Sequence, residues 1–65
     1  MSMFRMNQKV RHIKTGNVYK IVGTPETVRI EHLATPAYAY VPEDWKLIWI
    51  RPQTEMEDGR FEVVG

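Results

Sequence analysis

The stretch KVRHIKTGNVYKIVG, residues 9–23, alternates charged and apolar side chains on both sides of a Gly-Asn pair. This alternation predicts two antiparallel strands joined by a hairpin, because successive strand residues point to opposite faces. A two-residue Gly-Asn loop and a four-residue loop over 14–17 both have the even length that the pattern requires. Either loop gives a core face with Val10, His12, Tyr19 and Ile21 and a solvent face with Arg11, Ile13, Val18 and Lys20.

Short runs of β-branched and aromatic residues continue along the chain between Gly, Pro, Asn and Asp residues. We therefore expect an all-β fold that forms one domain over residues 1–65, with residues 1–7 frayed. Five or six short strands in so small a chain favour a closed barrel, because an open sheet leaves edges exposed. The predicted strands cover 9–13, 18–23, 27–33, 38–41, 45–51 and 60–64, with one helical turn near 53–56.

Composition limits the compartment and the class of protein. The chain has no cysteine, which excludes disulfides and thiolate metal sites and is typical of a reducing compartment. The N-terminal residues MSMFRMNQK contain no apolar run typical of a signal peptide. The longest unbroken apolar run, 47–50, is far shorter than the ~20 residues that span a bilayer. We expect a cytoplasmic protein that does not enter a membrane.

Charge is unevenly distributed between the two halves of the chain. Residues 1–33 carry six Lys and Arg against two Glu, and residues 34–65 carry three against six acids, with a net charge of +1 overall. If the last strand lies beside the first, Glu62 and its acidic neighbours face the N-terminal cations and partly neutralise them. Otherwise, blocks of opposite sign attract a charged partner.

The chain also resembles a family of small, functionally uncharacterised bacterial and phage proteins, whose members typically read Tyr-Arg-His-Tyr/Phe-Lys-Gly, Tyr-x-Val-x-Gly, Trp-x-Arg-Pro and Arg-Phe. The similarity covers the two ends of the chain; Thr15 interrupts the first motif, and residues 24–45 diverge. The resemblance implies a small SH3-like barrel and leaves the activity open. It is carried by Val10-Arg11-His12-Ile13-Lys14, Gly16, Tyr19, Val22, Gly23, Trp49-Ile50-Arg51-Pro52 and Arg60-Phe61-Glu62.

The residues that catalysis requires are missing or badly spaced. Ser2 is the only serine and lies in the terminus. His12 and His32 match no zinc spacing; we expect His12 to be a hydrogen-bonded barrel residue and His32 a half-exposed strand residue. The adjacent carboxylates of Glu43 and Asp44 point apart on an extended chain, so they make no acid–base pair. We therefore expect no enzyme activity, no cofactor and no metal.

Aromatic residues gather in the second half of the chain. Tyr38 and Tyr40 share one face of a predicted strand, and Trp45 and Trp49 share one face of the next predicted strand. Because both faces of 47–50 are apolar, this strand is either buried on both sides or carries a tryptophan on an exposed patch. Tyrosine and tryptophan are frequent in binding sites for proteins. The resulting prediction is a groove for an unidentified protein partner, formed by Tyr38, Tyr40, Trp45 and Trp49 and rimmed by Glu43 and Asp44.

Two alternatives remain open. A nucleic acid would use basic residues for phosphate and the tyrosines for base stacking, although the sequence pI of about 8.1 is below the > 9 typical of dedicated nucleic-acid domains. A weak homodimer would form by edge pairing of 38–41; otherwise the chain is a monomer. The nucleic-acid residues would be Arg5, Lys9, Arg11, Lys14, Lys20 and Arg29.

Overall fold

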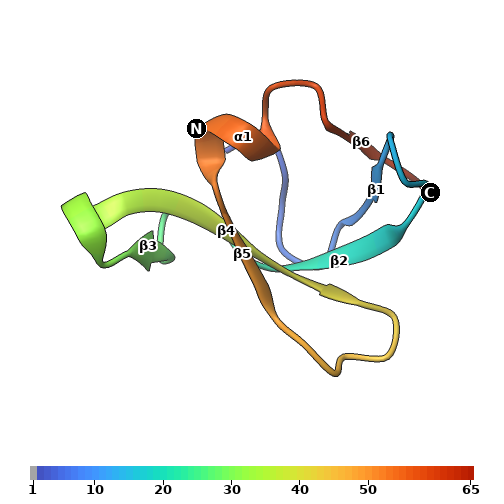
Figure 1. The fold of residues 1–65 in the computed structure, drawn as a ribbon, viewed down its shortest axis with the longest axis horizontal. Helices are drawn as coiled ribbons and strands as arrows, with labels where there is room; N and C mark the ends of the chain where they lie inside the picture. Colours follow the sequence, from blue (N-terminus) through green and yellow to red (C-terminus); the bar gives the residue numbers. More distant parts are fainter. Residues whose placement is uncertain (1) are drawn as a thin grey trace.

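A computed structural model describes residues 2–65 of the chain. It has six short strands in one antiparallel sheet, with one short α-helix and one 3-10 turn (Figure 1). The expected all-β class is confirmed. The elements are β1 (Lys9–His12), β2 (Val18–Gly23), β3 (Arg29–Ile30), η1 (His32–Ala34), β4 (Thr35–Pro42), β5 (Trp49–Pro52), α1 (Gln53–Met56) and β6 (Phe61–Val63).

The first hairpin has the predicted division of faces. Val10 lies opposite Tyr19 and Lys9 opposite Lys20, so the apolar pair shares one face and the two lysines the other. The loop is 13–16, and both the two-residue Gly-Asn loop and the loop 14–17 are wrong, because the His12 N–H donates to the Asn17 carbonyl at 2.9 Å and extends the ladder. Gly16 closes this turn with φ of +79°, a conformation that costs a glycine little.

Strand β4 is the centre of the sheet. It pairs with β2 and β3 on one edge and with β5 on the other. All five residues from Ala37 to Val41 are buried. The expected edge strand over 38–41 is therefore wrong: both edges of that segment are already paired within the chain, and the strand runs through the two prolines that were expected to bracket it.

The last strand returns beside the first, as expected. Arg11 lies opposite Glu62, and the Arg11 guanidinium donates to this carboxylate through Nε at 2.7 Å. The sheet order is β3-β4-β2-β1-β6, with β5 on the remaining edge of β4. Among residues 2–65, β5 and β6 share no strand pairing. Helix α1 connects these two strands, and the Arg51 guanidinium lies 5.7 Å from the centre of the Phe61 ring.

The core lies inside the curved sheet. Aromatic rings meet edge to face there, with 5.1 Å between the ring centres of Tyr19 and Tyr40 and 5.6 Å between Tyr40 and Phe61. This geometry is the one that aromatic quadrupoles favour. The buried cluster consists of Phe4, Val10, Ile21, Tyr38, Tyr40, Met56 and Phe61.

Four local expectations change, the first being that the predicted strand 45–51 begins only at Trp49. Phe4 is 1% exposed and its N–H donates to the Tyr38 hydroxyl at 3.0 Å, so residues 2–7 are not simply frayed; Met1 lies outside the described residues. The predicted strand 27–33 is reduced to two residues, because the chain must turn back at η1 before entering β4. His32 is accordingly exposed in a 3-10 turn rather than half-exposed in a strand. The helical turn at Gln53–Met56 is where it was predicted.

Candidate protein-interaction surface

The two tyrosines of the predicted groove lie in the core. Tyr38 is fully buried and Tyr40 is 5% exposed. The Tyr38 hydroxyl donates to Glu57 Oε2 at 2.5 Å, and the Tyr40 hydroxyl accepts from Arg51 Nε at 3.2 Å. Their prediction as exposed partner-binding residues is wrong, because β4 is covered on both faces.

Both tryptophans are exposed instead. Trp45 is 55% and Trp49 47% exposed, so the alternative in which this segment is buried on both sides is wrong. Trp45 lies in the turn after β4 with φ of +57°, and its backbone N–H donates to the Pro42 carbonyl at 3.1 Å. Trp49 begins β5 and lies opposite Tyr40.

The exposed tryptophans belong to a larger group of exposed apolar side chains. Figure 1 shows the β4–β5 hairpin projecting away from β1 and β6, with its tip at the bottom of the view. Five large apolar side chains in and just after this tip are 47–63% exposed. We call this set the apolar arm. It consists of Trp45, Leu47, Ile48, Trp49 and Ile50.

The sequence contained a signal for the three members that were not predicted as site residues. Residues 47–50 are all apolar, so both faces of an extended segment there are apolar. This is typical either of a strand buried on both sides or of an exposed apolar surface. Burial and exposure give the same pattern, so the sequence left both readings open. The structure shows that Leu47, Ile48 and Ile50 are exposed.

The acidic rim residues lie at the tip of the arm. Glu43 and Asp44 are both exposed in the turn between β4 and β5. Asp44 Oδ1 accepts the Lys46 N–H at 3.0 Å, a local bond that stabilises turns. Glu43 also lines a shallow pocket next to Trp45. The rim therefore combines two carboxylates with the Lys46 ammonium group.

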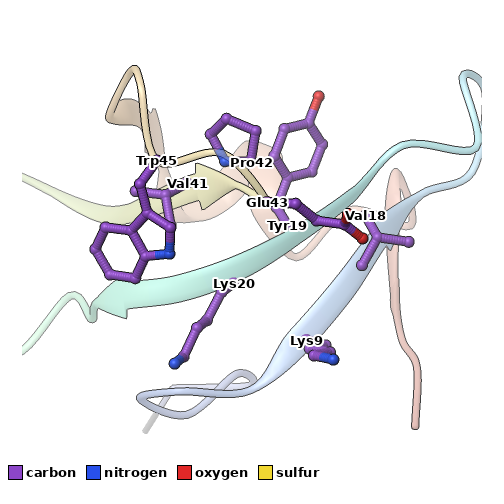
Figure 2. Close-up of a pocket in the computed structure, with 8 residues that line it drawn as sticks. All are labelled: Lys9, Val18, Tyr19, Lys20, Val41, Pro42, Glu43 and Trp45. Atoms are coloured by element: carbon purple, nitrogen blue, oxygen red, sulfur yellow. The ribbon is translucent and has the colours of Figure 1, made fainter.

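That pocket joins the arm to the first hairpin. It has a volume of about 230 Å³ and is lined by Lys9, Lys20 and Trp45 among others, and Figure 2 shows the Lys20 and Tyr19 side chains extending in opposite directions from β2. Lys20 Nζ lies 5.9 Å from the centre of the indole, within the range of a cation–π contact. Trp45 thus covers part of the solvent face of β2.

The predicted basic residues are only partly brought together. Lys9 and Lys20 are cross-strand neighbours, whereas Arg11, on the same face, is paired with Glu62. Arg29 lies on β3 and donates to the Ala34 carbonyl at 3.3 Å. Lys14 is in the β1–β2 loop. Arg5, next to the N-terminus, is exposed.

A second pocket, of about 240 Å³, lies between β5 and the β1–β6 pair. Trp49 and Phe61 form part of its wall, and the Arg51 guanidinium also lines it. A hydrogen bond from Arg51 to the Tyr40 hydroxyl, aided by Glu55, raises the pKa of Arg51 and keeps it charged. The lining residues are His12, Thr15, Tyr19, Tyr40, Trp49, Arg51 and Phe61.

His12 has a structural environment. Its Nδ1 lies 3.1 Å from the Thr15 hydroxyl oxygen, and its ring meets Phe61 edge to face at 4.9 Å. Within residues 2–65 there is no group of three or more His, Asp and Glu side chains placed to hold a metal ion. In the same part of the chain, no helix has the length and apolar character needed to cross a bilayer.

Comparison of the chain with family models, with curated proteins and with solved structures finds no match.

Proposed function

We propose that the chain is a non-enzymatic binding module that recognises a protein partner through the apolar arm. The observation that carries this proposal is the exposure of five large apolar side chains on one projecting hairpin. Several large apolar side chains exposed together on one segment of a soluble protein mark an interaction site. The charged residues at the tip, Glu43, Asp44 and Lys46, provide the polar rim that such interfaces have.

The proposal places the module in the SH3-like barrel class and in the cytoplasm. The return of β6 beside β1 and the helical turn between β5 and β6 support the first assignment. The absence of cysteine supports the second. Binding by an exposed hairpin requires no cofactor, which is consistent with a module that has no catalytic step.

The test compares two exposed leucines in a pull-down from lysate. Leu47 in the arm is 57% exposed and Leu33 in η1 is 83% exposed, so neither Leu47→Asp nor Leu33→Asp should unfold the protein. We expect Leu47→Asp to abolish capture of the partner and Leu33→Asp to leave it unchanged, with circular dichroism confirming the fold. Equal capture by the two variants would refute the proposal.

A second candidate function is binding of single-stranded nucleic acid. It is favoured by one observation: the exposed Trp45 ring lies beside Lys20, whose strand neighbour is Lys9. An exposed aromatic ring next to cations is the arrangement that stacks a base and contacts phosphates. Of the predicted cations, Lys9 and Lys20 would be the contact residues, with Arg11 held by Glu62.

Fluorescence anisotropy with single-stranded oligonucleotides tests this candidate. Two phosphate contacts predict that log K falls with log salt with a slope of about −1.4. The double variant Lys9→Gln, Lys20→Gln should remove that slope, and Lys14→Gln, in the loop, should retain it. Absence of binding at low salt would exclude this function and leave the protein-binding proposal standing.

A further inference from the structure

The edge of the sheet next to the arm is unprotected. Within residues 2–65, β5 pairs only with β4, and its other edge has no backbone partner. Proteins usually protect such edges with charges, proline or a covering segment. Here Arg51 and Pro52 protect the end of β5, but Ile48, Trp49 and Ile50 present three apolar side chains without a charge.

The sequence of this edge is self-complementary. Ile48-Trp49-Ile50 reads the same in both directions. When two such segments pair antiparallel around a two-fold axis at Trp49, each Trp49 lies opposite its own copy and each Ile48 opposite an Ile50. Because alternate residues point to opposite faces, the two indoles share one face and the four isoleucines the other.

The exposed area is large enough for such a contact. Each of the five arm side chains leaves about half of its surface in solvent, which is roughly 100 Å² for side chains of this size. Pairing through Ile48, Trp49 and Ile50 places about 600 Å² of exposed apolar side chain from the two copies side by side, the size of a weak, transient interface. The net charge of only +1 per chain gives little repulsion between copies.

We infer that the partner of the apolar arm is a second copy of this chain, paired through the free edge of β5 in an isologous dimer. This inference rests on the proposed function and names its partner. The pairing continues the sheet across the two-fold axis, gives the backbone groups of the free edge partners, and covers part of Ile48, Trp49 and Ile50 with their counterparts in the second copy.

Light scattering over a concentration series tests the dimer. We expect the wild-type chain to approach twice its mass of 7.7 kDa and Ile50→Lys to remain at the single mass. Val63→Lys is the matched control, because Val63 on β6 is 51% exposed and Ile50 is 50% exposed; it should still dimerise. A wild-type chain that stays at 7.7 kDa up to about millimolar concentration overturns the inference, as does a dimer that Ile50→Lys leaves intact.

A disulfide trap tests the register. The chain has no cysteine, so Trp49→Cys introduces a single thiol at the two-fold axis, where opposed Cβ atoms lie about 4.5–5.5 Å apart. Mild oxidation should cross-link Trp49→Cys much faster than Leu33→Cys, which is exposed but distant in the fold. Equal cross-linking rates overturn the strand-paired arrangement.

The failures of the two proposals are distinguishable. A monomer that captures another protein in a manner sensitive to Leu47→Asp overturns the dimer and retains the binding function. A dimer that captures nothing else supports self-association as the function of the arm. A monomer with no captured protein overturns both proposals.

Discussion

The hydroxyl group of Tyr38 joins three segments that are distant in the sequence. It accepts the Phe4 N–H and donates to Glu57, whose carboxylate also accepts the Met3 N–H at 3.0 Å and Gln53 Nε2 at 3.1 Å. Burial raises the pKa of Tyr38, and the bond to Glu57 raises it further, so the hydroxyl remains a donor. The N-terminal residues are held against β4 by this network.

Removing the hydroxyl should destabilise the fold. In Tyr38→Phe the Phe4 N–H loses its partner in a buried site, which costs about 1–3 kcal/mol in the free energy of unfolding. Urea denaturation measures the change. Tyr19→Phe is the control, because Tyr19 is only partly buried and no hydrogen bond of its hydroxyl occurs within residues 2–65. A loss equal to that of the control would show that the network contributes nothing.

The same network predicts acid sensitivity. Burial alone would raise the pKa of Glu57, but the hydrogen bonds from Tyr38, Met3 and Gln53 outweigh it and lower the pKa below its ordinary value of 4.5. A carboxyl group whose pKa is lowered by folding stabilises the fold at pH values above its ordinary pKa. This contribution is lost as the pH falls through the pKa of the folded state.

Urea midpoints between about pH 6 and pH 3 should therefore fall with acidification in the wild type and fall less steeply in Glu57→Gln. The glutamine keeps the size of the side chain but does not titrate. Parallel pH profiles for the two proteins would contradict this role of Glu57.

The close approach between β2 and β4 determines how the sheet is covered on its outer face. Between Ile21 and Gly23 the register shifts by one residue, which indicates a β-bulge at Val22. Gly23 then lies opposite Ala39, and the segment after β2 brings the Val28 side chain against Gly23. Ala39 is 7% exposed at this point of β4.

A methyl group at residue 23 should not fit. A Cβ built on Gly23 lies 2.5 Å from Val28 Cγ2 and 3.1 Å from Ala39 Cβ, so Gly23→Ala should cost about 1–3 kcal/mol by overpacking. Adding Val28→Ala removes the nearest atom and should recover part of the loss. Urea denaturation of the two single variants and the double variant measures this coupling; additive changes would show that Val28 is not the obstacle.

Across the whole molecule, the large apolar residues fall into two groups. The core group, centred on Tyr40, Ile21 and Phe61, is at most 5% exposed, whereas the apolar arm is 47–63% exposed. The core group stabilises the fold, and we propose that the arm serves binding. The chain thus leaves two tryptophans outside its core, although burying them would add stability.

Matched Ile→Ala variants separate the two groups. Ile21 is fully buried and Ile48 is 63% exposed. Ile21→Ala should lower the free energy of unfolding by about 2–5 kcal/mol, and Ile48→Ala by about 0.5 kcal/mol or less. Thermal and urea unfolding at a concentration low enough to keep the chain monomeric give both values. Similar losses would mean that the arm packs into the fold.

Much of the fold could be read from local patterns. The alternation of charged and apolar residues over 9–23 predicted which face of the first hairpin lies in the core. Pro52 and the residues after it predicted the helical turn. These features depend on neighbours in the sequence, so alternation and turn chemistry are sufficient to find them. The pairing of β6 with β1, which was expected if the barrel closes there, gave the Arg11–Glu62 pair, although within residues 2–65 β5 and β6 do not pair.

The candidate site depended on contacts between distant segments. Tyr38 and Tyr40 have the composition of a binding surface, but they are buried because Phe4 packs against Tyr38, and Tyr19 and Phe61 pack against Tyr40. Trp45 and Trp49 have the composition of a core, but the hairpin that carries them extends beyond the rest of the sheet. Alternation places a side chain on one face of a strand; whether another segment covers that face depends on how the whole chain packs, and here that packing buried the two tyrosines of the predicted groove and left its two tryptophans exposed.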